Sequence, residues 1–422
     1  MTVATYRGAP PPTSTTPAGN PARIALTGLG LALAVIVGWD GSTAGRVIRV
    51  VVVGLATAGA VAGVGASRQS SRGWVQILAG LVGVVTGLGI GLPHLTHGAF
   101  DAQGLAGLVA LVAGGWLLVV GAIDVLRVTT GWRKALAVPL GLLIGVFVLY
   151  PLPMALYATN LPTPALDTAT PADRGLTFFD AAFSTDDGVP LSGWYIPSHN
   201  GAAVVMVHGA STTRSQLLDY ALVLARRGFG VLLYDSRGHG RSGGRAMEYG
   251  WLGDHDVSAA VTYASRQLDV HPGWVGAVGV GLGADQVLGA SVADQRIKAV
   301  VADGATGRAI SDGAWLPKGP LGWVRRGVDA VAYSSASLLS NSAPPESLRQ
   351  AVAGTAPRPV LLVAGDGSGS GEADAARWIE SGAPNSTQLW ISPGAGRGAA
   401  FPAHPQQWEA VVVKFLTTTL LK

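Results

Sequence analysis

The 422-residue chain contains no cysteine and few charged residues. The absence of cysteine excludes disulfide bonds, thiolate metal sites and a cysteine nucleophile. The charged residues, 13% of the total, are unevenly distributed: residues 1–160 contain nine Lys or Arg and three acidic residues, whereas the remainder contains twenty and twenty-two. The net charge of +4 therefore does not describe a basic face, and we expect no nucleic-acid partner.

Long uncharged runs dominate the first part of the chain. An apolar run of about 18 or more residues is long enough to cross a bilayer as a helix. Five runs approach this length, at 24–39, 50–66, 73–92, 104–123 and 135–158. We interpret 23–158 as an all-α transmembrane bundle of about five spans, preceded by a disordered tail over 1–22 that is rich in Pro and Thr. The first run is short, so the count of four or five spans stays open, as does its being a signal segment.

The loops between these runs differ in positive charge. With five spans, one side of the membrane carries seven basic residues and the other only two before the last span ends; the seven are Arg7, Arg23, Arg68, Arg72, Arg127, Arg133 and Lys134, and the two are Arg46 and Arg49. Because positively charged loops stay in the cytoplasm, the first side is predicted to be cytoplasmic. The second half of the chain is then expected on the extracytoplasmic side of the plasma membrane, with the lipid bilayer as its partner.

The second half has the pattern of a globular domain. Residues 159–175 are rich in Pro, Thr and Ala and predict an extended linker. From residue 176 to 422, strand-like apolar runs such as "VLLY" and "VLLV" alternate with helical patterns. This alternation indicates an α/β fold with a mostly parallel, doubly wound sheet.

Four motifs in this half carry a resemblance to a known family. They are "VHGAST" at 207–212, "YDSRGHGRSGG" at 234–244, "VGAVGVGLGADQ" at 275–286 and "PGAGRGAAFPAHPQQW" at 393–408. Together they resemble the α/β-hydrolase family, in particular its dienelactone-hydrolase-like and small-esterase branches. The resemblance covers 176–422 and implies an α/β-hydrolase fold and descent from a serine esterase.

The family's nucleophile position is vacant in this sequence. In the family, a serine stands at the centre of a Gly-x-Ser-x-Gly elbow between a strand and a helix. Here the stretch "GVGLGADQ" contains no Ser, Thr or Cys, and the resemblance places Gly281 where the serine would be. Glycine offers no nucleophile, and it removes the backbone strain that a side chain bears at such a turn.

The other two members of the family's triad are also altered. The resemblance places Arg397 at the position of the histidine base, and an arginine stays protonated and cannot accept a proton. His404, seven residues further on, matches a helix-start position instead. The acid position falls on Ser368, bracketed by Asp366 and Glu372, either of which is a candidate residual acid. We expect the surviving carboxylate to be structural, pairing with Arg397 or capping a helix.

A ligand pocket is nevertheless expected around the elbow. The resemblance implies an oxyanion loop and pocket formed by His208, Gly209, Ala210, Ser211 and Leu282. With the fixed positive charge of Arg397 beside it, the pocket is suited to a small anionic or ester-like ligand. Our leading interpretation is a membrane-anchored, catalytically impaired α/β-hydrolase-like protein that acts in ligand binding or scaffolding at the cell envelope.

Three alternatives to this interpretation are open. The first is an active esterase with a relocated nucleophile such as Ser211, although we expect the hydroxyls of Ser211, Thr212 and Ser236 to bond to backbone. A metal site is the second, and we disfavour it because loops of this family are tied together structurally; its candidate ligands are Asp235, His239, Asp254, His255 and Asp256. The third, a dinucleotide fingerprint at 279–284, lacks its acidic partner. We therefore expect no metal and no cofactor.

Overall fold

The computed structural model describes residues 20–38, 43–66, 69–97, 101–340, 342–369 and 371–421. The chain divides into two compact units: one contains 1–87 and 105–137, and the other 88–104 and 138–422. All but the last three residues of the predicted N-terminal tail, 1–22, lie outside the described residues.

The first unit is helical. Its described helices are α1 (Pro21–Val37), α2 (Thr43–Ala66), α3 (Gln69–Thr86), most of α5 (Ala102–Val128) and η2 (Gly131–Leu136). Small residues let α3 and α5 approach closely: a Cβ on Gly80 would lie 2.5 Å from the backbone nitrogen of Leu118. Close backbone approach at small residues is typical of helix packing in membranes.

Four described helical stretches are long and apolar enough to cross a membrane. They are Thr43–Val64, Ser71–Thr96, Ala102–Val128 and Gly131–Thr159, and Pro21–Val37 is a shorter apolar helix. These stretches fall on the five runs found in the sequence, and the length of the first run is the reason that four, not five, meet the criterion. The fourth stretch consists of η2, α6 (Ala137–Ile144), η3 (Gly145–Leu149) and α7 (Pro151–Thr159).

Proline explains the irregular turns inside two of these stretches. The π-helical segment η3 ends at Leu149, two residues before Pro151, and a second π-helical segment, η1 (Gly87–Gly91), precedes α4 (Leu92–Thr96), which contains Pro93. Proline lacks a backbone N–H and its ring clashes with the carbonyl four residues earlier, so the preceding turn widens. The helix continues through both prolines.

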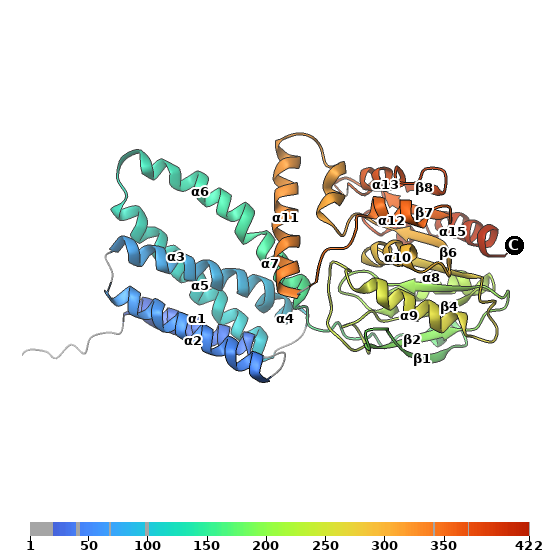
Figure 1. Cartoon of the computed structure of the whole chain (residues 1–422), viewed down its shortest axis with the longest axis horizontal. Helices are drawn as coiled ribbons and strands as arrows, with labels where there is room; N and C mark the ends of the chain where they lie inside the picture. The colour runs from blue at the N-terminus through green and yellow to red at the C-terminus, as the bar shows by residue number, and fades with distance from the viewer. Residues whose placement is uncertain are drawn as a thin grey trace, which may run out of the picture. The chain divides into compact units, whose positions relative to one another are not determined.

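An eight-stranded sheet forms the centre of the second unit (Figure 1). The strand order is β1-β2-β4-β3-β5-β6-β7-β8; β1 and β2 are antiparallel to their neighbours and the rest are parallel. The strands are β1 (Phe179–Ser184), β2 (Pro190–Ile196), β3 (Ala203–Val207), β4 (Gly230–Tyr234), β5 (Val275–Val280), β6 (Ile297–Asp303), β7 (Val360–Gly365) and β8 (Thr387–Ser392). Strands β3 to β7 are buried along their length apart from one residue, as their uninterrupted apolar runs predict.

Helices cover both faces of this sheet. One apolar core lies between the sheet and α9 (Gly253–Ser265), α10 (Leu282–Ala293), α12 (Leu348–Thr355) and α13 (Glu372–Glu380); the other lies under α8 (Leu218–Arg226), α14 (Ala400–Ala403) and α15 (Pro405–Leu420). Short turns η4 (Pro171–Arg174), η5 (Arg214–Leu217) and η6 (Ile310–Trp315) complete the unit. The predicted doubly wound α/β architecture is confirmed.

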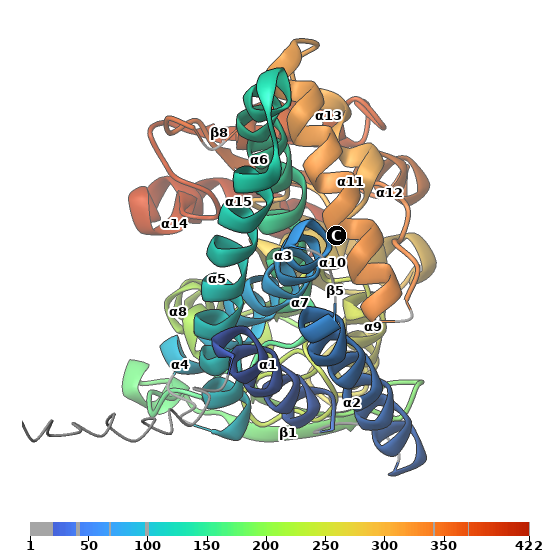
Figure 2. The ribbon, with the colours of Figure 1, turned by 90° about the vertical axis from the view of Figure 1, so that its left-hand side faces the viewer.

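One long helix lies outside the two covering layers. Helix α11 (Pro320–Ser340) is inserted between β6 and β7, and it packs against α7 (Figures 1 and 2). Gly327 of α11, which has no side chain, lies against Phe147 of η3. An added Cβ on Gly327 would lie 2.9 Å from the Phe147 ring. The end of the last apolar stretch and the inserted helix are therefore packed together.

The predicted linker, 159–175, is irregular except for η4, but it is not a free spacer. Leu161 and Pro164 are buried, and the backbone N–H of Gly240 donates to the carbonyl of Pro164. The apolar side chains of Leu161, Leu166 and Ala169 gain more by packing than a solvated, extended chain would. The segment is part of the second unit, which already begins, after the separate stretch 88–104, at Val138.

Candidate functional site

The site is centred on the sharp turn between β5 and α10. Gly281 stands at this turn with φ +57° and ψ −116°, and its N–H donates to the carbonyl of Asp303 at 2.7 Å. Residues other than glycine rarely adopt a positive φ. The backbone is that of a strand-to-helix elbow that points residue 281 away from the sheet, and the position holds glycine.

The three glycines of the elbow have different steric surroundings. A Cβ on Gly279 would lie 2.1 Å from the carbonyl oxygen of Gly283, and a Cβ on Gly283 would lie 2.3 Å from that of Val207. A Cβ on Gly281 would meet only the Cα of Gly209, at 3.8 Å. The flanking glycines are required by close backbone packing, whereas the central position has room for a side chain.

The loop that follows β8 lies beside the elbow. A Cβ on Gly398 would be 3.4 Å from the backbone nitrogen of Gly281. Its neighbour Arg397, at the position where the family resemblance places the histidine base, lines the same cavity as Gly281. His404 does not lie in that cavity lining; its Nε2 is 2.8 Å from the carbonyl of Pro393, and it precedes α15.

Of the two candidate acids, Glu372 is buried and Asp366 is exposed. One oxygen of Glu372 accepts the N–H of Gly365 and the other accepts that of Gly398, next to Arg397. Burial raises the pKa of Glu372 to about 6, although these two N–H groups and Arg397 act in the opposite direction. Asp366 instead accepts the N–H of Gly394. Glu372 thus ties the base-position loop to β7, which differs from the direct pairing with Arg397 or helix capping expected from sequence.

The loop after β3 is fastened to the loop after β4 by His208. Its Nε2 accepts the N–H of Ser236 at 3.0 Å, which places the proton on Nδ1, 2.8 Å from the carbonyl of Gly209. Burial, together with the nearby His239, lowers the pKa of His208 to about 3. His208 is therefore a neutral structural residue, while Gly209, Ala210 and Leu282 line the cavity beside Gly281.

Ser211 is part of a chain of side-chain hydrogen bonds that sequence reasoning missed. The Tyr157 hydroxyl of α7 lies 2.6 Å from the Ser211 hydroxyl, which donates to Glu248 at 3.3 Å. Glu248 in turn lies 2.9 Å from Nε2 of His239, and both are buried. Ser211 has a φ of +56°, alone among the described non-glycine residues. Such strained backbone occurs preferentially at functional sites.

The expected roles of the neighbouring hydroxyls are only partly correct. Thr212 donates to the carbonyl of Gly209, as expected. Ser211 bonds side chains and not backbone, and the buried hydroxyl of Ser236 has no hydrogen-bond partner among the described residues. The reason for the first difference is tertiary: Tyr157 and Glu248 reach Ser211 from distant segments. Nothing in the local sequence around Ser211 indicates either contact.

A cavity of about 940 Å³ opens at the elbow. Asp285, one helical turn after Gly281, lines it and is fully buried; one of its oxygens accepts the N–H of Thr306, and the other has no hydrogen-bond partner among the described residues. Burial raises the pKa of Asp285 to about 7 against the opposing effect of Arg397. Sequence reasoning missed Asp285, although residues four apart on a helix share a face and the spacing from Gly281 could have indicated it.

Most of the acidic and histidine residues that are candidate metal ligands form hydrogen bonds or ion pairs with other residues. Asp235 accepts the backbone N–H groups of Arg214 and Arg241, Asp256 pairs with Arg237, and Asp254 pairs with Arg308. These contacts tie loops together. Of the two histidines, His239 pairs with Glu248, and His255 lies on the surface.

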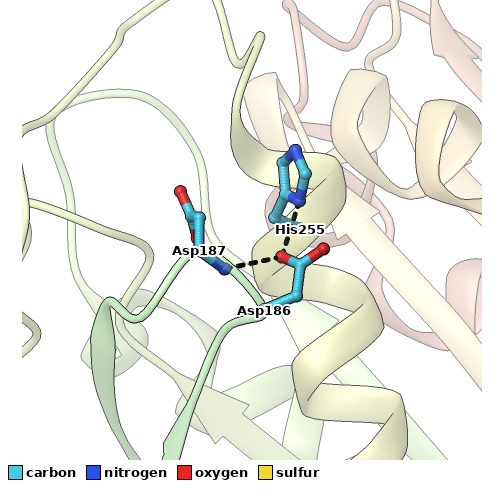
Figure 3. Close-up of side chains that lie close together, drawn as sticks. All are labelled: Asp186, Asp187 and His255. Carbon is cyan, nitrogen blue, oxygen red and sulfur yellow. Dashed lines mark hydrogen bonds and ion pairs between the residues drawn. The ribbon is translucent and has the colours of Figure 1, made fainter.

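Asp186, Asp187 and His255 meet at an exposed loop close enough to share a cation (Figure 3). Nδ1 of His255 lies 2.7 Å from Asp186, whose oxygen also accepts the N–H of Asp187. The carboxylate of Asp187 already pairs with the two terminal nitrogens of Arg237, which lowers the pKa of Asp187. In the described residues these contacts form an ion-pair network at the surface.

Comparison with protein families adds to this geometry. Residues 141–390 match the model of the family described as X-Pro dipeptidyl-peptidase (S15 family). Among curated proteins, Rv2307c of Mycobacterium tuberculosis (strain ATCC 25618 / H37Rv) is 36% identical over 134 residues, 31% of this chain and 45% of that protein. The thiohydrolase aneE of Aspergillus aculeatus is 31% identical over 126 residues, 29% of this chain and 40% of that protein. The chain thus spans less than half the length of these two relatives.

A solved structure gives the same fold. The esterase Pf2001 of Pyrococcus furiosus superposes with a TM-score of 0.50 at 22% identity, covering 61% of this chain and 97% of that protein. The second unit therefore has the α/β-hydrolase fold, preceded by a helical region with apolar helices.

The steric contrast within the elbow generates a prediction. Gly283→Ala should destabilise the protein more than Gly281→Ala, because the first forces a Cβ against the Val207 carbonyl whereas the second costs only the strain of a positive φ, about 1–3 kcal/mol. Thermal unfolding of both full-length variants in the same detergent measures this difference. An equal or reversed order of unfolding temperatures would contradict the steric account.

Proposed function

Because the chain belongs to the X-Pro dipeptidyl-peptidase (S15) family but has glycine at the centre of its elbow, we propose that it binds an anionic or ester-like ligand without serine-hydrolase turnover. The observation that carries this proposal is the pair of residues at the elbow and beside it. Gly281 has no side chain to attack a substrate, and Arg397 cannot accept a proton at neutral pH. Triad members act as a unit, so two changes remove the nucleophilic mechanism and leave binding.

The electrostatics of the cavity support an anionic or ester-like ligand. Arg397 brings a permanent positive charge to the elbow end of the cavity. The backbone N–H of Leu282 begins α10, where the helix dipole favours negative charge. Glu372 and Asp285 have pKa values raised toward neutrality by burial, which reduces the negative charge that opposes an anion.

We place this binding domain outside the cytoplasm, anchored in the plasma membrane at the cell envelope. The support is the distribution of positive charge: basic residues stand at or just before the start of the second and the last of the four long apolar stretches, Arg68 and Arg72 at the second and Arg133 and Lys134 at the last. Loops rich in Lys and Arg stay in the cytoplasm. This orientation does not depend on whether the shorter helix α1 also crosses the membrane.

The orientation predicts the behaviour of a carboxyl-terminal reporter. Alkaline phosphatase fused after Lys422, which is active only outside the cytoplasm, should be active, and a fluorescent protein that folds only in the cytoplasm should be dark at the same position. The matched control is the same pair of reporters fused after Arg127, where the opposite result is expected. A fluorescent carboxyl-terminal fusion would refute the proposed topology.

The proposed binding function predicts ligand-dependent stability. Butyrate should raise the unfolding temperature of the detergent-solubilised full chain more than the neutral butyramide does, and Arg397→Ala should abolish that difference. Arg377→Ala is the matched control, because Arg377 is an exposed arginine that contacts Asp374 and does not line the cavity. If butyrate gives no stabilisation, or if the control has the same effect, Arg397 is not an anion site.

Turnover tests the loss of catalysis. The wild-type chain should not hydrolyse p-nitrophenyl acetate or butyrate above the Gly281→Ala level, whereas the double variant Gly281→Ser with Arg397→His should gain turnover because the elbow has room for the serine. Wild-type turnover that survives in Gly281→Ala would point to another nucleophile.

A specific observation favours a second candidate, an esterase that uses Ser211. Its strained φ and its hydrogen bonds to Glu248 and Tyr157 resemble those of an activated hydroxyl. This candidate predicts covalent labelling by a fluorophosphonate probe that is lost in Ser211→Ala and kept in Thr212→Ala. Absence of labelling under conditions in which an active serine esterase is labelled would exclude it.

A further inference from the structure

The lining of the cavity at the elbow combines polar and apolar parts. Gly281, Asp285 and Arg397 line it at the elbow, and we call this part the polar end. We call the apolar end the part lined by Val146 and Met154 of the Gly131–Thr159 stretch and by Leu321, Val324, Val328 and Ala332 of α11, a helix that also contributes Arg325, Asp329 and Tyr333 to the lining. A site with one polar and one apolar end fits an amphiphilic ligand better than a small ester.

The apolar end is built on a helix that is long and apolar enough to cross a membrane. Gly145, Val146, Tyr150, Met154 and Tyr157 all belong to this stretch and all line the cavity. Tyr150 and Met154 are also 58% and 44% exposed. They therefore form a wall that faces the cavity on one side and the surroundings of a membrane helix on the other.

The opposite wall, α11, has the composition of a membrane-interface helix. Its first turns expose Leu321 (86%) and Trp323 (71%), with the basic residues Lys318 and Arg325 beside them. Large exposed apolar side chains are costly in water, and tryptophan with flanking Lys or Arg is typical of the boundary between lipid and water. Since α11 packs against α7 and contacts η3, the surface that fits this face is the bilayer in which that stretch lies.

The size of the cavity agrees with a ligand larger than a short ester. Its volume of about 940 Å³ is near the upper end of the range of roughly 300–1,000 Å³ for small-molecule sites. One oxygen of Asp285, fully buried, has no hydrogen-bond partner among the described residues, and in its protonated form this carboxyl group can donate a hydrogen bond to an ester or carboxylate head.

We propose that the cavity binds a lipid with one acyl chain, its ester or carboxylate head at Gly281 and Arg397 and its chain directed between α11 and the Gly145–Thr159 segment toward the bilayer. This inference rests on the proposed binding function and names the class of its ligand. The apolar walls provide affinity through burial of the chain, and Arg397 orients the head. Entry from the membrane means that the ligand need not dissolve in water.

Photolabelling of the full chain in phosphatidylcholine vesicles tests the proposal. The vesicles carry a small fraction of a fatty acid with a diazirine at the end of its chain, and labelled peptides are mapped by mass spectrometry. Label should appear on the peptides that contain Val146, Met154 and Val328, because these side chains line the apolar end. Excess unlabelled palmitate should compete, and butyrate should compete far less.

Two tryptophan variants separate the cavity from the lipid-facing surface. Met154→Trp fills the apolar end and should reduce labelling of the Val328 peptide by about tenfold. Leu338→Trp adds the same bulk to an exposed position of α11 that does not line the cavity, and it should leave labelling unchanged. Label confined to the exposed face of α11 and equal in both variants would overturn the proposal, since the lipid would then only surround the protein.

Two further experiments test whether the lipid enters from the bilayer and whether the anion-binding function holds without the lipid inference. The same probe presented on albumin, without vesicles, should label the detergent-solubilised chain more slowly if the lipid enters from the bilayer; equal rates would overturn membrane entry. Butyrate stabilisation that depends on Arg397, without chain labelling in the cavity, would refute the lipid inference alone. Loss of both would refute the anion-binding function as well.

Discussion

The close packing of backbone at the elbow is the constraint on which the rest of the site depends. Gly283 lies against the carbonyl of Val207, and Gly279 lies against that of Gly283, so β3, β5 and α10 meet at distances that no side chain would permit. This packing turns residue 281 outward and brings the ends of β3 and β6 and the loop after β8 to one point. The scaffold that presents a nucleophile is therefore intact around a residue that has none.

Arg397 stands where the family resemblance places the histidine base, and this residue sets the charge beside the elbow. A histidine beside Gly281 would be neutral or charged according to pH, whereas Arg397 is always charged. Burial raises the pKa of Asp285 to about 7, so a fall in pH through this range removes a negative charge near Arg397. The same surroundings that would shift the pKa of a catalytic acid thus favour an anion in the cavity as the pH falls.

Local sequence patterns predicted the structural features that depend on residues close together in the chain. The alternation of apolar strands and helices predicted the α/β sheet, and the Gly-x-Gly-x-Gly spacing lies where the structure has the turn between β5 and α10. Glu248 and Tyr157 were not foreseen, because they reach Ser211 from segments 37 and 54 residues away. Contacts of this kind depend on tertiary packing and have no periodicity in the sequence.

The division of the chain into compact units differs from the one that composition predicts, for the same reason. Hydropathy changes sharply near residue 158, so composition predicts a linker there, but the folded unit continues back to Val138 and includes α7. Tyr157 bonds Ser211, and Glu248 donates its N–H to the carbonyl of Ala158. The last apolar helix is consequently a wall of the cavity. A domain cut at the apparent linker would lose that wall, and its behaviour would not represent the cavity of the full chain.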